Sequence, residues 1–333
     1  MAANYKTQTI NSLIRENLDR MIREPVKWTD FLTSRACRNY GLRFDQILSI
    51  YSLDPEAGEC ATYEAWQKCG RPVRHGTRGL PVLSGDGNEI KYYYPIKTTV
   101  ETEKAVKLFR LGRQHTGIIG RSYGISQADY RELYTGIKED LSHILDEEKE
   151  AHDADWKNLM QGLKITHPSG ETEPEAWTSM TMYDLIQKSA ALIVSTSLET
   201  EPGEADLSTD FNETIRQLDT DKLIIVGTMA VNCARKFLVR CKQIIKEEMK
   251  NREDKQENGL DDRAGRGNSG ADLRADRDNI RDVRDEKEGI SAGDGAGDVR
   301  GTADPGPSGS PLRDDRRTGE GDGGIDHQQD DGN

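Results

Sequence analysis

The sequence of 333 residues has no long apolar run. No segment approaches the ~20 consecutive apolar residues that cross a bilayer. The N-terminus is polar and of mixed charge, whereas a secretion signal has a basic flank followed by an apolar stretch. We therefore expect no membrane partner and a cytoplasmic location.

Motifs for catalysis and metal binding are also missing. The chain contains no Gly-x-x-x-x-Gly-Lys-Ser/Thr, no Gly-x-Gly-x-x-Gly after a predicted strand, no His-Glu-x-x-His and no Gly-x-Ser-x-Gly. Its six histidines form no pair four residues apart, and its five cysteines form no Cys-x-x-Cys. An odd number of cysteines in a long chain favours reduced intracellular thiols. We expect no enzymatic activity, cofactor or metal; a nuclease or protease with an unrecognised site is the weaker alternative.

Charge and glycine divide the chain into three parts. The net charge of −13 is the sum of +6 over residues 1–125, −10 over residues 126–250 and −9 over residues 251–333. The last part holds 16 of the 32 glycines and has no Phe, Tyr, Trp or Cys, so it has too little apolar surface to offset the entropy of ordering. We therefore expect a domain at 1–125, an acidic helical region at 126–250 and a disordered tail at 251–333.

Apolar residues at helical spacing predict several helices. Residues 4–24 form an amphipathic pattern that ends at Pro25, and the Ser-x-x-Asp pattern at 126–129 is typical of a helix N-terminus. Further helices are expected over residues 28–41, 44–51, 61–69, 180–198 and 221–251, and from residue 130 onward.

One part of the sequence predicts β-structure. The glycine-rich run at residues 85–88 separates Leu80-Pro81-Val82-Leu83 from residues 89–96, which are rich in Tyr and β-branched residues. Because two strands alone are marginally stable, a small sheet packed on the N-terminal helices is expected. The predicted class is α+β: N-terminal helices on a small antiparallel sheet, then a mainly helical region and the tail.

Residues 62–83 combine cations, glycines and an aromatic residue in the one part of the chain with a positive net charge. Arginine binds phosphates with its planar fork, and aromatic rings stack on unpaired bases, so this combination is typical of proteins that bind single-stranded nucleic acid. A basic turn with Trp66 and every second tyrosine in the core is the alternative. The predicted nucleic-acid-binding residues are Trp66, Arg71, Arg74, His75, Arg78, Lys91, Tyr92 and Tyr94.

The same region resembles a known family. The matching residues are Trp28-x-x-Phe31-Leu32, Gln46 to Tyr51, Pro55, Ala61-Thr62, Trp66 and Gly70-Arg71-x-Val73-Arg74-x-Gly76-x-Arg78-Gly79-Leu80-x-Val82. They are similar to the ArdC-like N-terminal region of large proteins of conjugative elements and phages, which continue into DNA methyltransferase and helicase modules.

This resemblance implies a non-enzymatic domain that binds single-stranded DNA, of the antirestriction type, in a mobile genetic element or phage. Replication proteins of the element are then further partners. Ser52-Leu53 and an insertion near Gly58-Glu59 depart from the family pattern. The protease-like activity of ArdC is not carried over, because this chain has no His-Glu-x-x-His.

The acidic half of the chain suggests a second hypothesis. An acidic, DNA-like surface can bind a basic protein partner, so the chain is alternatively an anti-defence protein that inhibits a host nuclease or restriction enzyme directly. The acidic tail is also expected to compete with DNA for the arginines.

Overall fold

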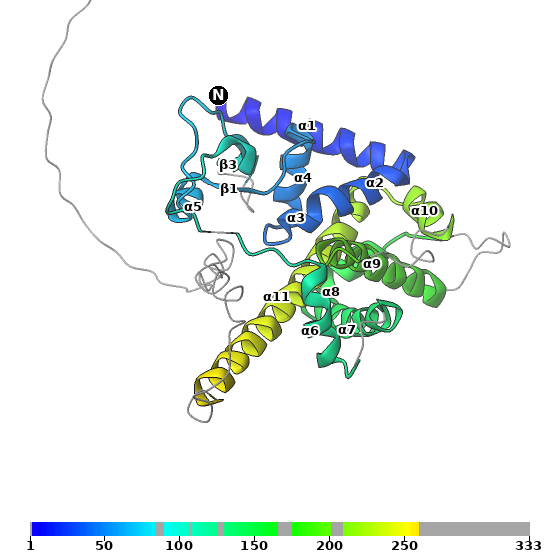
Figure 1. The fold of residues 1–333 in the computed structure, drawn as a ribbon. Helices are drawn as coiled ribbons and strands as arrows, with labels where there is room; N and C mark the ends of the chain where they lie inside the picture. Colours follow the sequence, from blue (N-terminus) through cyan, green and yellow to red (C-terminus); the bar gives the residue numbers. More distant parts are fainter. Residues whose placement is uncertain are drawn as a thin grey trace, which may run out of the picture. The chain divides into compact units, whose positions relative to one another are not determined.

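The computed structural model describes residues 2–83, 90–106, 108–125, 130–165, 175–200 and 209–259 (Figure 1). These residues form many helices and one small antiparallel sheet, which confirms the predicted α+β class. The predicted turn at 85–88, the helix cap at 126–129 and the tail from residue 260 lie outside the described residues.

The N-terminal helices follow the apolar pattern, with one shifted boundary. Helix α1 (Ala2–Arg23) buries Leu18 and Met21. Pro25 begins the next helix, so the helix predicted from residue 28 starts earlier; proline fits a first helical turn because no N–H is required there. The list of elements is α2 (Pro25–Phe31), the π-helical turn η1 (Leu32–Ala36), α3 (Cys37–Asn39) and α4 (Phe44–Leu53).

The sheet contains a strand that the apolar pattern does not predict. The predicted hairpin forms strands β2 (Leu80–Leu83) and β3 (Ile90–Pro95), but residues 60–62 add a third strand, β1 (Cys60–Thr62). The order is β1-β3-β2, and both pairs are antiparallel. The predicted helix at 61–69 therefore starts later, as α5 (Tyr63–Lys68), with the side chain of Thr62 accepting a hydrogen bond from the N–H of Ala65 at 3.4 Å.

The C-terminal half is helical, as predicted. Its longest helix packs along two others, α7 and α9, and continues beyond the predicted end at residue 251. Its elements are the short turn η3 (Arg113–His115), α6 (Thr116–Ser122), α7 (Tyr130–Ala151), α8 (Asp153–Met160), α9 (Glu175–Ser197), α10 (Thr209–Arg216) and α11 (Thr220–Gly259).

Both halves share one hydrophobic core. The indole Nε1 of Trp28 in α2 donates a hydrogen bond to Ser189 Oγ in α9 at 3.2 Å. A Cβ atom on Gly227 in α11 would stand 2.2 Å from Phe44 Cε2 in α4, so only glycine permits this close approach of the two helices. All described residues belong to one compact unit, and the predicted boundary at residue 125 falls inside it.

None of the described helices combines the length and the apolar character that a membrane-spanning segment requires.

Candidate nucleic-acid interface

The segment Gly70–Gly79, here called the basic loop, is held along its first half by a second segment, residues 98–104. Val73 forms an isolated antiparallel bridge with Thr99, and the N–H of Arg74 donates to Thr98 O at 3.0 Å. Thr102 Oγ1 donates to Gly70 O at 2.7 Å. The loop is therefore ordered by contacts with residues 24 to 32 positions further along the chain.

Gly70 is required where the loop begins. Its φ is +66°, a left-handed conformation that side chains rarely adopt. A Cβ atom there would also stand 2.5 Å from the carbonyl oxygen of Lys104. Glycine thus lets α5 end and the loop turn directly against the second segment.

Arg71 belongs to the anchoring contacts of the loop. Its Nη2 lies 2.9 Å from Glu101 Oε2, and its side chain is only 13% exposed. Its Nε is buried with no hydrogen-bond partner among the described residues. The prediction that Arg71 offers an exposed cation to phosphate is therefore corrected: the guanidinium is turned toward the segment that holds the loop.

Arg74, His75 and Arg78 are exposed on the outer part of the basic loop. Gly76, with φ +79°, makes the turn between them, and the N–H of Thr77 donates to Arg74 O at 3.2 Å. No ion pair joins these three side chains to a carboxylate within the part of the chain that the structure describes. Their charges therefore face solvent.

The outer side of the sheet brings tyrosines beside this loop. Tyr92 and Tyr94 alternate with the buried Tyr93, so both rings lie on the same side of β3. Together with Arg78, Gly79 and Pro81 they line a shallow depression of about 440 Å³, here called the tyrosine face. Three of the eight predicted residues, Arg78, Tyr92 and Tyr94, thus meet at one place.

Glycine and a further tyrosine shape the tyrosine face. A Cβ atom on Gly79 would stand 2.8 Å from Tyr94 Cζ, so the loop passes directly against that ring. Tyr63, which is 41% exposed, meets Tyr94 edge to face with ring centroids 6.2 Å apart. Tyr63 is not among the predicted site residues because no spacing rule links the start of α5 to strand β3.

Trp66 is not available as a stacking platform. It is 2% exposed, and its Nε1 donates a hydrogen bond to Tyr94 O at 2.7 Å. Tyr93 is buried to the same degree, and its hydroxyl accepts a hydrogen bond from Gln46 Nε2 at 3.2 Å. Burial raises the pKa of Tyr93. The prediction for Trp66 is corrected, and the alternative that places Trp66 and every second tyrosine in the core is confirmed.

Lys91 lies on the other side of the strand. Its Cα partner is Val82, which is fully buried, and consecutive residues of a strand point to opposite faces. Lys91 therefore shares the side of Tyr93, although its own side chain is exposed. The sheet does not bring Lys91 to the tyrosine face.

The described residues include no group of three His, Cys, Asp or Glu side chains arranged to hold a metal ion. All five cysteines are buried. Burial raises the pKa of the Cys37 thiol to about 11, so this thiol is a poor nucleophile at neutral pH.

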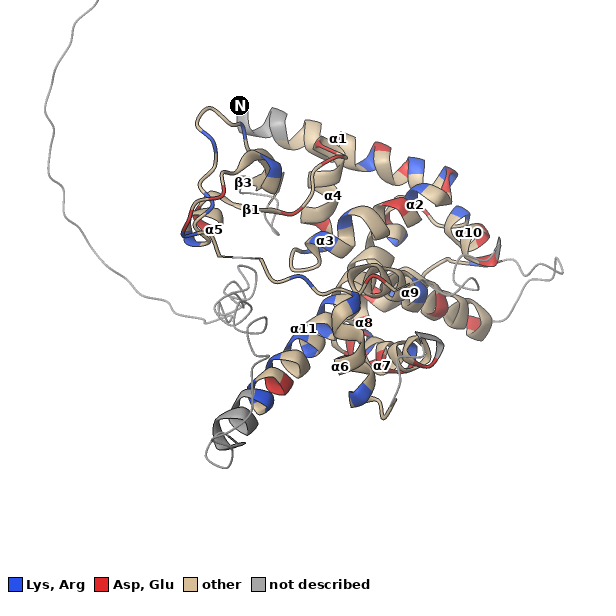
Figure 2. Ribbon diagram, in the orientation of Figure 1, with Lys and Arg blue, Asp and Glu red and all other residues tan. Residues whose placement is uncertain are grey.

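Carboxylates of the acidic half are partly paired inside the structure. Glu148 in α7 is 3% exposed; its Oε1 lies 2.8 Å from Lys236 Nζ, and its Oε2 accepts a hydrogen bond from Asn232 Nδ2 at 3.1 Å. Arg240 Nη2 lies 3.8 Å from Glu147 Oε1. Figure 2 shows that basic residues recur along the second half of α11. Glu148 is therefore absent from any acidic surface that could bind a basic protein partner, whereas the side chain of Glu147 stays 56% exposed.

No protein-family model, curated protein or solved structure matches this chain.

Proposed function

We propose that this protein is a non-enzymatic module that binds single-stranded DNA in the cytoplasm. The observation that carries the proposal is the shared depression of Arg78, Tyr92 and Tyr94, next to the exposed Arg74 and His75 of the basic loop. A cationic loop beside exposed rings suits a strand whose phosphates and bases are both accessible.

The free energy of stacking bases on aromatic rings favours a single strand over a duplex. Each base stacked on an aromatic ring contributes about 1–3 kcal/mol, and every base has a ring face to offer. In a duplex these faces are covered by neighbouring base pairs. Tyr92, 44% exposed on the outer side of the sheet, therefore adds affinity only for unpaired bases.

Phosphate contacts supply the remaining affinity and make it dependent on salt. Each contact with a single strand contributes about 0.7 to the slope of log affinity against log salt concentration. Among the described residues of the basic loop, Arg74, His75 and Arg78 are the basic side chains exposed for such contacts. Arg71 contributes by holding the loop.

The resemblance of residues 25–85 to the ArdC-like region supports the same activity. It extends the proposal to a role in a mobile genetic element or phage, including protection of incoming single-stranded DNA from restriction. Within this role, replication proteins of the element are proposed as additional partners.

The proposal is tested by fluorescence anisotropy with a labelled oligonucleotide. Replacing Arg74 and Arg78 together by Ala should weaken binding and lower the salt slope by about 0.7 for each lost contact. Tyr92→Ala should weaken binding by about 1–3 kcal/mol with an unchanged slope. Arg216→Gln is the matched control: it removes one exposed cation on α10, distant in sequence from both the basic loop and the sheet. Equal affinities for the double variant and the control would overturn the assignment.

A further inference from the structure

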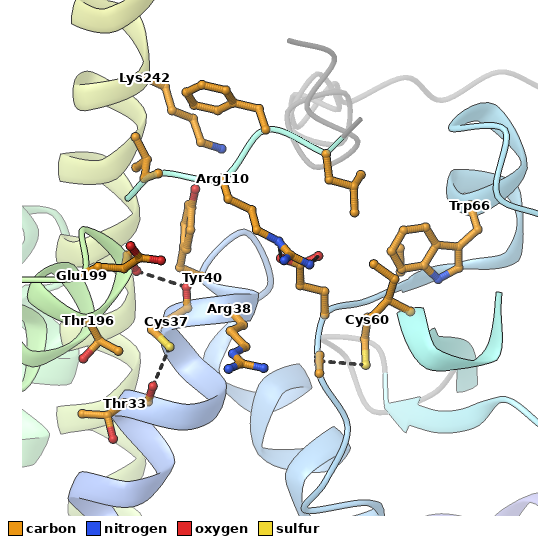
Figure 3. Close-up of a pocket in the computed structure, with 18 residues that line it drawn as sticks. Thr33, Cys37, Arg38, Tyr40, Cys60, Trp66, Arg110, Thr196, Glu199 and Lys242 are labelled. Carbon is orange, nitrogen blue, oxygen red and sulfur yellow. Dashed lines mark hydrogen bonds and ion pairs between the residues drawn. The ribbon is translucent and has the colours of Figure 1, made fainter. Parts of the chain in front are cut away.

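A second concave site lies between the N-terminal helices, the first strand and α11. It is a cavity of about 460 Å³ that no motif in the sequence predicts. Three cations reach it from separate parts of the chain: Arg38 from α3, Arg110 from the segment before η3, and Lys242 from α11 (Figure 3). We call this site the cation cavity.

The charged side chains of the cation cavity differ in their contacts and in their exposure. Arg110 donates two hydrogen bonds to Glu59, from Nε to Oε1 at 2.7 Å and from Nη2 to Oε2 at 3.0 Å. This hydrogen bonding to Glu59 raises the pKa of Arg110. Glu199 is the second carboxylate in the lining. Lys242 is 5% exposed, with its Nζ 5.1 Å from the centroid of the Tyr40 ring. Arg38 is exposed and has no ion pair with a carboxylate of the described residues.

The cation cavity adjoins the proposed DNA interface. Ala61 of β1, which lines the cavity, is the strand partner of Tyr94, which lines the tyrosine face. Trp66 also lines the cavity and donates its hydrogen bond to Tyr94 O. The strand pair Ala61–Tyr94 thus contributes one residue to each of the two concave sites.

We propose that the cation cavity binds the phosphorylated terminal nucleotide of the single strand held on the tyrosine face. A terminal phosphomonoester carries about −1.5 to −2 charges at neutral pH, compared with −1 for an internal diester. Because three cations and two carboxylates line the cavity, it favours the more highly charged phosphomonoester over an internal diester. The planar guanidinium of Arg38 can donate two parallel hydrogen bonds to the phosphate oxygens. The volume lies in the ordinary range of about 300–1,000 Å³ for small-ligand sites.

A purely structural role for the same cations makes a different prediction. Helix α9 ends at Ser197 in the cavity wall, and a helix C-terminus carries about half a negative charge. If Arg38, Arg110 and Lys242 only balance this charge and the two carboxylates, a terminal phosphate gains nothing.

This inference rests on the proposed function, and one experiment separates their outcomes. Anisotropy is measured with one oligonucleotide of about 12 nucleotides in three forms: with a 5′-phosphate, with a 3′-phosphate and with neither. The strand phosphorylated at the bound end should bind roughly tenfold more tightly than the unmodified strand. Which phosphate has this effect identifies the end in the cavity.

Arg38→Gln should abolish the difference between phosphorylated and unmodified strands. Arg38→Lys should restore part of the difference, and Arg216→Gln should keep all of it; melting curves show that each variant is folded. Binding of all three strands with equal affinity would overturn the inference and leave the proposed function standing. No binding of any strand would overturn both.

Discussion

Gly79 lies so close to the sheet that a Cβ atom on it would stand 2.8 Å from Tyr94 Cζ and 2.9 Å from Tyr92 Cβ. The backbone of Gly79 is not in the left-handed region, so glycine is needed here for space alone. This contact holds the end of the basic loop against the rings that the account assigns to DNA bases.

Gly79→Ala should therefore displace the tyrosine rings without straining the backbone. We expect DNA affinity to fall by about 1–3 kcal/mol, the contribution of one stacked base. Gly117→Ala in α6 is the matched control, since a Cβ atom there meets nothing within 4 Å. That control should leave DNA affinity unchanged and raise stability by about 0.5–1 kcal/mol. A Gly79→Ala variant that binds like the wild type would show that the rings do not contact bases.

Variants of the ion pair between Arg71 and Glu101 distinguish two roles of Arg71: holding the basic loop in place, or contacting a DNA phosphate directly. If Arg71 only anchors the loop, both Arg71→Ala and Glu101→Gln should speed hydrogen exchange of the Arg74 amide, which donates to Thr98 O. Both variants should also weaken DNA binding. If Arg71 instead contacts phosphate, Glu101→Gln should tighten binding, because it removes a competing carboxylate.

Asp219 provides a pH-dependent contribution to stability at the start of α11. Desolvation raises its pKa, but hydrogen bonds from the side chain and the N–H of Lys222, the latter at 2.8 Å, outweigh that effect and lower the pKa below its usual value. A lowered carboxyl pKa stabilises the fold above the unfolded-state pKa of about 3.9, and the stabilisation is lost as pH falls through the folded-state pKa.

Asp219→Ala should cost about 1 kcal/mol at neutral pH, the usual effect of losing a helix cap. Denaturant unfolding at several pH values tests this. The difference from the wild type should shrink below the unfolded-state pKa. A difference that is constant down to the lowest pH would show that the charge of Asp219 has no part in the effect.

Glu148 should be among the most important carboxylates for stability. Its removal leaves Asn232 without its acceptor and Lys236 without its closest carboxylate partner. Because Lys236 stays partly solvated, we expect Glu148→Ala to cost about 3 kcal/mol, the lower end of the range for breaking a buried pair. Glu150→Ala, an exposed position on the same helix, should change stability by less than about 0.5 kcal/mol. Similar melting temperatures for both variants would contradict this account.

Local patterns in the sequence predict much of the fold. Apolar spacing predicts α1 and the long helix α11. The alternation of three tyrosines along β3 is compatible with two orientations of the strand, and the structure has the one in which Tyr93 is buried. Strand β1 escapes prediction because three residues, Cys60–Thr62, carry no periodic signal and gain their strand conformation by pairing with β3.

The candidate site is harder to predict because its decisive contacts are non-local. The basic segment is visible in the sequence, but the ion pair that turns Arg71 inward joins it to a residue in the segment that follows the hairpin. Composition likewise does not show that Trp66 is buried against Tyr94. The cation cavity depends on charged residues from α3, α11 and three other segments, which only the tertiary fold brings together.

The central claim is tested most directly by anisotropy titrations of the wild-type protein with single-stranded and duplex oligonucleotides of the same sequence at two salt concentrations. We expect tighter binding of the single strand at both concentrations, with a log–log slope near 0.7 for each phosphate contact, hence about 1.4 to 2.1 for the two or three cations of the loop. Equal affinity for both forms, or single-strand binding that does not change with salt, would contradict the claim.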